Sequence, residues 1–158
     1  MTTRSVTHAT FTLERAYAAT PARVFAAFSD PEAKAVWFGG EHDGFTTTRH
    51  AFDFRPGGVE SSESRHPGGF TTTFDATYHN IVPDERIVYS YAMTLDGNPT
   101  SASLTTIELV PEGSGTHLTI TEHGAFLDDF DNADQREQGT SELLDALGAA
   151  LDPSAPVH

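Results

Sequence analysis

Five clusters of turn-forming residues divide the middle of the chain into short segments, and no other feature of the sequence restricts the fold as strongly. The clusters are Pro56–Gly58, Pro67–Gly69, Pro83–Glu85, Asp96–Pro99 and Glu112–Gly115. The segments beside them are rich in β-branched and aromatic residues, as strands are. The predicted strands are Thr46–Arg55, Val59–Arg65, Phe70–Ile81, Arg86–Thr94, Ser101–Val110 and Thr116–His123. Connections this short join antiparallel strands, because a parallel crossover needs about a dozen residues or more.

The N-terminal part adds one strand and two short helices to this meander. Alternation of apolar and polar residues predicts a first strand over Thr7–Tyr17. A capping residue followed by proline marks a helix start, and this signal occurs twice, at Thr20-Pro21 and at Asp30-Pro31. We therefore expect two short helices directly after the first strand.

The last predicted element is a long amphipathic helix, Asn132–Leu151. Its apolar stripe consists of Thr140, Leu143, Leu144, Leu147 and Leu151. Seven antiparallel strands cannot bury their apolar face without a partner. At about 1.5 Å per residue this helix spans roughly 30 Å, which makes it the only predicted element large enough to cover them. The predicted fold class is α+β, with a seven-stranded antiparallel sheet wrapped around the C-terminal helix and a cavity between the two.

Length and charge restrict the domain organisation and the partners. The chain has 158 residues, which predicts a single domain over 1–158 with a core at about residues 10–151. Its formal net charge is −14 and its arginines are scattered, so we expect neither nucleic acid nor a membrane as a partner. The N-terminus lacks the apolar stretch of a secretory signal, and no apolar run is long enough to cross a membrane. The expected location is therefore cytoplasmic.

Neither a metal site nor a cofactor is predicted. The chain has no cysteine, and its 8 histidines are dispersed without the spacing of metal ligands. The acidic segment Asp128–Asp134 does not match a calcium loop, because the sixth position counted from Asp129 is Asp134 and not glycine. The Gly-Gly pairs lie between strands and not before a helix, so they do not form a phosphate-binding loop.

Seven short motifs follow one another along most of the chain. They are Ala19–Phe28, Asp30–Glu32, Trp37–Gly39, Asp53–Gly58, Ile81–Tyr89, Gly115–Glu122, and Gly139 with Leu143–Leu147. In this order they resemble the START/Bet v-type helix-grip superfamily, also called SRPBCC. More narrowly, they resemble its branch named for the activator of the ninety-kilodalton heat-shock protein ATPase. The resemblance spans about residues 10–151 and implies the helix-grip fold, but this superfamily includes lipid carriers, hormone binders, cyclases and chaperone regulators.

Strand alternation predicts which side chains face the cavity. Glu122 continues the face of Leu118 and Ile120, and the resemblance implies that Glu60 also points inward. Many relatives have tryptophan directly after the helix glycine, so Thr140 at this position predicts extra room beside the helix. The candidate ligand-binding residues are Glu122, Glu60, His50, Tyr78, Tyr89, Tyr91, Trp37, Phe52, Phe74, Thr140 and Leu144.

Alternatives remain open at three of the predicted interior positions. Glu122 either orients a ligand or transfers protons, or it forms an ion pair with a residue such as Arg15 or Arg55, or it is a strand-end residue at the mouth of the sheet. Trp37 either packs under the helix-to-strand loop or covers the cavity mouth. Gly139 weakens a helix interior, which suggests a close approach to the sheet or to a ligand.

Three functional hypotheses follow from these expectations. The first is a helix-grip protein that binds a small, largely apolar or amphipathic molecule, because aromatic cavities with few polar groups are typical of small-molecule sites. The second is an enzyme of the cyclase or hydrolase kind, in which Glu122 or Glu60 acts with His50 as general acid and base. The third is a protein-interaction module with a protein client, as the resemblance to heat-shock ATPase activators implies. A homodimer is compatible with all three.

Overall fold

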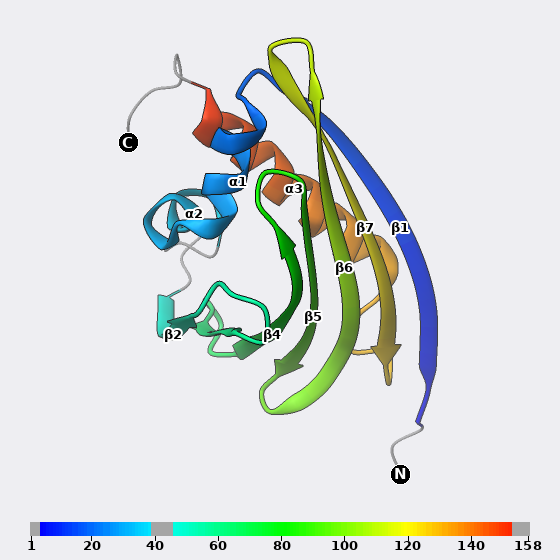
Figure 1. The fold of residues 1–158 in the computed structure, drawn as a ribbon. Coiled ribbons are helices and arrows are strands. Elements are labelled where there is room, and N and C mark those ends of the chain that lie inside the picture. Colours follow the sequence, from blue (N-terminus) through cyan, green and yellow to red (C-terminus); the bar gives the residue numbers. More distant parts are fainter. Residues whose placement is uncertain (1–3, 39–45, 153–158) are drawn as a thin grey trace.

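The computed structural model describes residues 4–38 and 46–152, and it contains the predicted elements in the predicted order (Figure 1). The strands are β1 (Val6–Tyr17), β2 (Thr46–Phe52), β3 (Val59–Arg65), β4 (Thr71–Val82), β5 (Arg86–Leu95), β6 (Asn98–Glu112) and β7 (Gly115–Leu127). The helices are α1 (Pro21–Ser29), α2 (Pro31–Trp37) and α3 (Ala133–Leu151). The α+β fold class, with two short helices after the first strand, is confirmed.

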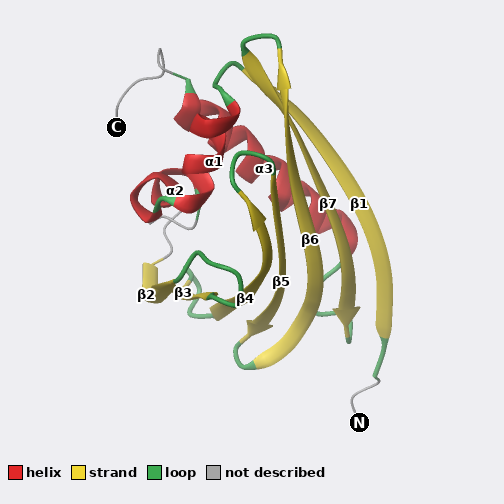
Figure 2. Ribbon diagram, viewed as in Figure 1, coloured by secondary structure: helices red, strands yellow, loops and turns green. Residues whose placement is uncertain are grey.

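The seven strands form one antiparallel sheet in the order β1-β7-β6-β5-β4-β3-β2. From β2 to β7 each strand pairs with the next one along the chain, and β1 pairs with β7. Figure 2 shows that the sheet is curved and that α3 runs obliquely across its strands on the side where α1 and α2 also lie. The arrangement is that of a helix-grip fold.

Side-chain caps explain where the three helices begin. The Thr20 hydroxyl accepts a hydrogen bond from the Arg23 amide at 3.3 Å, and the Asp30 carboxylate accepts one from the Glu32 amide at 3.0 Å. Asn132 caps α3 in the same way. It therefore precedes the first helical residue, which shifts the predicted start of this helix by one position.

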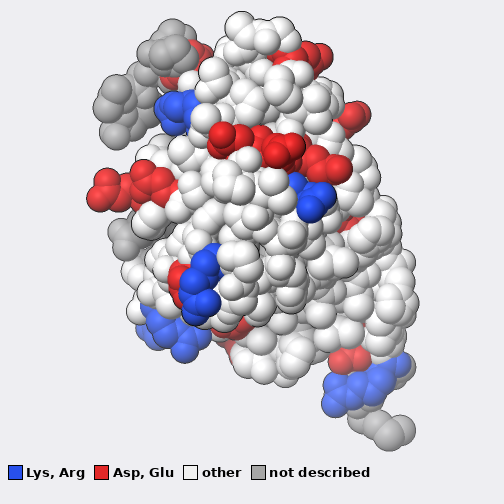
Figure 3. Space-filling model, viewed as in Figure 1, with Lys and Arg blue, Asp and Glu red and all other residues white. Residues whose placement is uncertain are grey.

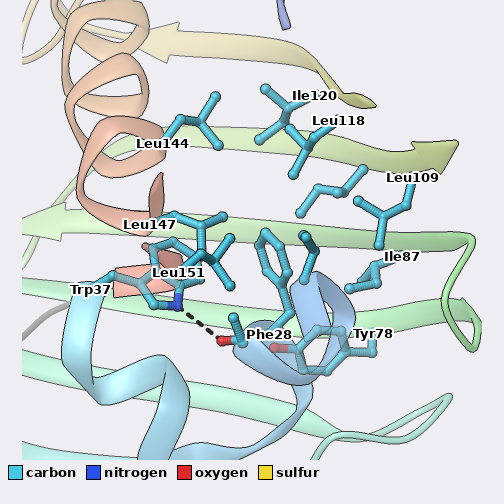
Figure 4. Close-up of a cluster of buried hydrophobic side chains, with 13 residues drawn as sticks. Phe28, Trp37, Tyr78, Ile87, Leu109, Leu118, Ile120, Leu144, Leu147 and Leu151 are labelled. Atoms are coloured by element: carbon cyan, nitrogen blue, oxygen red, sulfur yellow. Dashed lines mark hydrogen bonds between the residues drawn. The ribbon is translucent and has the colours of Figure 1, made fainter. Parts of the chain in front are cut away.

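The core is formed where α3 meets the sheet (Figure 4). Leu144, Leu147 and Leu151 of α3 are almost fully buried and belong to one cluster with Leu118 and Ile120 of β7. This contact buries the apolar stripe that the sequence predicts, because neither the helix nor the sheet can cover its own apolar face.

Trp37 joins the two short helices to this core. Its indole nitrogen donates a hydrogen bond to the Ala27 carbonyl at 2.9 Å, and its ring packs edge-on against Phe28 (Figure 4). Only 4% of the residue is exposed, so its side chain is a fixed part of the core. The loop under which it was expected to pack falls within residues 39–45, outside the described residues.

The second strand is shorter than predicted because its last residues form a turn. β2 ends at Phe52, and the Gly58 amide donates to the Arg55 carbonyl at 2.8 Å. A Cβ atom at Gly58 would lie 2.1 Å from the Asp53 carbonyl oxygen, so only glycine fits this turn. Strands β6 and β7 extend beyond their predicted ends.

Charged side chains are dispersed over the face of the molecule that Figure 3 shows. Acidic and basic groups both lie among uncharged residues, and several basic groups stand directly beside acidic ones. Among the described residues, none of the helices combines the length and the apolar character that a membrane crossing requires. Charged side chains also lie in the interior, where they form ion pairs. These buried pairs belong to the site described next.

Candidate functional site

A cavity of about 400 Å³ lies between the sheet and α3. Its walls are mainly aromatic and aliphatic, with a small number of polar groups. Of the predicted site residues, eight border it: Trp37, Phe74, Tyr78, Tyr89, Tyr91, Glu122, Thr140 and Leu144. The structure therefore brings together residues from α2, β4, β5, β7 and α3 that lie far apart in the sequence.

The other three predicted residues, His50, Phe52 and Glu60, border a smaller cavity of about 210 Å³ between α2 and strands β2 and β3. His50 is exposed and lies next to Phe52, with 6.3 Å between the ring centroids. Glu122 belongs to the wall of the larger cavity. Of the two acid–base pairs considered, His50 and Glu60 therefore border the same cavity, whereas His50 and Glu122 border different ones.

Glu122 is buried on β7 and is fully engaged in hydrogen bonds. The Tyr91 hydroxyl donates to its Oε2 at 2.8 Å, and the Thr105 hydroxyl donates to its Oε1 at 3.2 Å. The guanidinium of Arg136 lies 3.5 Å from Oε2. A buried carboxylate needs such partners to offset its lost hydration, and here both of its oxygens have them.

Arg136 connects this carboxylate to the start of α3. It donates to the Tyr91 hydroxyl at 2.9 Å, to the Ser101 hydroxyl at 2.7 Å and to the Asp131 carboxylate at 2.6 Å. Burial acts to lower the pKa of Arg136, but Tyr91, Asp131 and Glu122 together raise it. The guanidinium is therefore a fixed cation in the cavity wall.

The ion-pair partners predicted for Glu122 are wrong. In the β1–β7 register Phe11 lies opposite Glu122, whereas Arg15 lies opposite Leu118. Arg15 is too far along the strand and bonds to Asp145 of α3 instead. Arg55 pairs with Asp53 within its own turn. The real partner comes from α3, about one turn after the helix start, where no pattern in the sequence marks it.

Glu60 is the centre of a second buried cluster. It is 1% exposed, and its Oε1 accepts hydrogen bonds from Lys34 Nζ at 2.6 Å and from the Tyr78 hydroxyl at 2.5 Å. The Lys34 ammonium also lies over the rings of Phe38 and Phe52. Lys34 was missed in the sequence, although one signal was available: it is the only lysine in the chain.

Three tyrosines connect the two charged clusters. The ring centroids of Tyr78 and Tyr89 are 5.8 Å apart, and those of Tyr89 and Tyr91 are 5.9 Å apart. Burial raises the pKa of all three hydroxyls, and nearby carboxylates raise it further. The hydroxyls therefore stay protonated at neutral pH, and those of Tyr78 and Tyr91 donate to Glu60 and Glu122 respectively.

The helix side of the cavity is open at Gly139 and Thr140. The Thr140 hydroxyl donates to the Arg136 carbonyl one turn earlier, at 2.9 Å. A Cβ atom built at Gly139 would meet nothing within 4 Å. Gly139 therefore does not approach the sheet closely but borders the cavity, and the alternative of a close approach to a ligand stays a prediction.

Titratable groups elsewhere do not form a metal site. Within residues 4–38 and 46–152, no group of three or more histidine, aspartate or glutamate side chains is placed to hold a metal ion. The acidic segment before α3 is used for other contacts. Asp128 accepts hydrogen bonds from Arg4 and from the Ser5 amide, and Asp131 binds Arg136.

Comparisons with known proteins agree with the fold. The model of the family described as activator of Hsp90 ATPase homolog 1-like protein matches residues 18–152. A solved structure from Rhizobium loti is 50% identical, with a TM-score of 0.86, and the match covers 93% of this chain and 99% of that one. One from Rhizobium leguminosarum is 43% identical, with a TM-score of 0.89 and coverage of 95% and 98%. A third, from Chromobacterium violaceum, is 31% identical, with a TM-score of 0.75 and coverage of 92% and 98%. No curated protein matches the sequence.

Proposed function

Since this chain belongs to the family of activator of Hsp90 ATPase homolog 1-like proteins, a branch of the helix-grip superfamily, we propose that it binds a small, largely apolar molecule between its sheet and α3. The observation that carries this proposal is the cavity of about 400 Å³. Small-molecule sites are typically concave, mainly apolar and about 300–1,000 Å³ in volume, with a few polar groups that orient the ligand.

The charges around the cavity indicate what kind of molecule it accepts. Glu122 and Asp131 both pair with Arg136, and Glu60 pairs with Lys34. An anionic ligand would lose its hydration without finding a free cation in these pairs. An uncharged molecule with an apolar body and one or two hydrogen-bonding groups fits this lining better.

Native mass spectrometry of the purified protein tests the proposal directly. We expect a co-purified small molecule, or binding of an added apolar probe such as 1-naphthol. Gly139→Leu should reduce this binding at least about tenfold, because the new side chain would occupy cavity volume that is empty at this position. Ala146→Leu, on the exposed face of the same helix, is the matched control and should leave binding unchanged.

The enzyme alternative and the protein-client alternative give different results in the same experiments. An acid–base enzyme would convert its ligand, and Glu122→Gln would then abolish turnover while binding remains. A protein-interaction module would capture a client in a pull-down equally well with the wild type and with Gly139→Leu. Equal probe binding by Gly139→Leu and Ala146→Leu would refute the proposed binding site.

A further inference from the structure

Lys34 is the only lysine in a chain whose other basic side chains are all arginine. It lies on α2, with 11% of its side chain exposed, and it borders both the larger and the smaller cavity. A guanidinium does not lose its proton at physiological pH, whereas a buried amine can. The single amine side chain of this protein therefore stands between two mainly apolar cavities.

The groups around Lys34 are suited to moving a proton. Its Nζ lies 2.6 Å from Glu60 Oε1 and 3.4 Å from the Tyr78 hydroxyl. Burial lowers the pKa of Lys34, although the neighbouring Glu60 carboxylate opposes this shift. The other carboxylate oxygen, Glu60 Oε2, is buried and has no hydrogen-bond partner in the described part of the chain. Glu60 thus has an unused acceptor position next to the amine.

From this arrangement we infer that Lys34 forms imines with small apolar aldehydes or ketones, and that Glu60 carries the proton for this reaction. The inference rests on the proposed function in one respect: the carbonyl compound reaches Nζ through the larger cavity, which Lys34 borders. Lysine side chains in apolar surroundings are known to act as carbonyl-binding nucleophiles.

The reaction balances with the groups present. Glu60 takes a proton from the Lys34 ammonium, which leaves a neutral amine beside a carboxylic acid. The nitrogen lone pair then bonds to the carbonyl carbon, the carbonyl π pair moves to the oxygen, and a nitrogen proton follows it to give a carbinolamine. Glu60 returns its proton to the hydroxyl group, which leaves as water while the nitrogen lone pair forms the C=N bond. The product iminium keeps one positive charge beside the regenerated carboxylate.

Reductive trapping of the purified full chain tests this inference. Benzaldehyde is added with sodium cyanoborohydride, which reduces an imine to a stable secondary amine, and the modified residues are mapped by peptide mass spectrometry. Arg23→Lys supplies an exposed reference amine on α1 in the same molecule. We expect Lys34 to be trapped at least about tenfold faster than this reference, because burial lowers its pKa and because it borders the cavity in which the aldehyde binds. Equal or slower trapping of Lys34 would overturn the inference.

A matched pair of variants tests the role of Glu60. Glu60→Gln keeps the side-chain shape but removes the proton carrier, whereas Glu63→Gln makes the same change elsewhere on β3. Glu60→Gln also removes the carboxylate that opposes the lower pKa of Lys34, so a carboxylate that acted on the pKa alone would make this variant react faster. If Glu60 carries the proton, trapping at Lys34 should instead slow at least about tenfold in Glu60→Gln and remain unchanged in Glu63→Gln. Equal rates in the two variants would show that Glu60 does not carry the proton. If Glu60→Gln does not fold, the ratio of Lys34 to the reference amine still decides whether Lys34 is the reactive group.

Two further measurements separate this inference from the proposed function. Toluene has the ring of benzaldehyde without its carbonyl group, so it should slow the trapping of Lys34 if both enter the same cavity. Binding of an apolar molecule without any trapping at Lys34 would refute imine formation and leave the proposed function standing. Fast trapping that neither toluene nor Gly139→Leu slows would support the reactive amine and contradict entry through the larger cavity.

Discussion

Two glycines lie inside α3, Gly139 and Gly148. The structure leads us to expect that replacement by alanine raises the free energy of unfolding at Gly139 but not at Gly148. Alanine is more favourable than glycine in a helix interior by about 1 kcal/mol. A Cβ atom at Gly139 would meet nothing within 4 Å, so Gly139→Ala should gain this full amount. For a chain of this length, a gain of about 1 kcal/mol raises the melting temperature by roughly 2–4 °C.

Gly148 is the glycine that has a close neighbour. A Cβ atom there would lie 3.1 Å from Cε1 of the Tyr17 ring. This ring cannot move freely, because its hydroxyl donates to the Leu144 carbonyl at 2.7 Å. Overpacking of this kind costs about 1–3 kcal/mol, which offsets or exceeds the helix-propensity gain. Gly148→Ala should therefore leave the free energy of unfolding unchanged or lower it by up to about 2 kcal/mol.

Urea unfolding followed by far-UV circular dichroism measures both changes in free energy. Ala146→Gly, at an exposed position of the same helix, calibrates the propensity and should cost about 1 kcal/mol. Tyr17→Phe should recover stability in the Gly148→Ala background, since it frees the ring to shift. If Gly148→Ala stabilised the protein as much as Gly139→Ala, the argument from the Tyr17 contact would be wrong.

Three further expectations concern the core and the charged groups. Leu147 is fully buried, so Leu147→Ala should cost about 2–5 kcal/mol in thermal or urea unfolding, and a negligible loss would mean that α3 does not cover the sheet. Arg136→Gln should lower the free energy of unfolding by about 3–5 kcal/mol, because it leaves the Glu122 carboxylate buried without its cation. Adding Glu122→Gln should restore part of this loss. A double variant no more stable than Arg136→Gln alone would contradict the pairing. A hydrogen bond to the Glu14 carboxylate raises the pKa of His117. The stabilisation from this pair is therefore fully present below the unfolded-state pKa of histidine, about 6.5, and it is lost as the pH rises through the folded-state pKa. Urea midpoints of the wild type should show this loss, and those of His117→Gln should not.

The sequence allows the fold to be predicted almost completely, because local signals determine most of it. Turn residues such as Pro56–Gly58 separate the strands, and the capping residues Thr20 and Asp30 start the short helices. Apolar spacing identifies the buried face of α3 correctly at Leu144 and Leu147. Each of these signals acts within a few residues, so a pattern in the sequence contains the necessary information.

The candidate site is less predictable because its pairs form across the fold. Alternation is enough to show that Glu122 points inward, but its partner Arg136 comes from another element and depends on how α3 crosses the sheet. The same holds for Lys34 and Glu60, which meet only after α2 has packed against β3. Gly139 left the prediction open for a related reason: a glycine in a helix signals either a close neighbour or an empty space, and the sequence does not distinguish them.

The pairing of β1 with β7 has a consequence for the order in which the chain folds. Every other strand pair joins neighbours in the sequence, whereas contacts between β1 and β7, such as that of Glu14 with His117, join residues 103 positions apart. Closing so large a loop costs more conformational entropy than forming a hairpin, and it slows folding. During synthesis β1 leaves the ribosome first, but its partner strand emerges after the whole meander. Of the seven strands, β1 is therefore made first but takes its place in the sheet only after the other six are available.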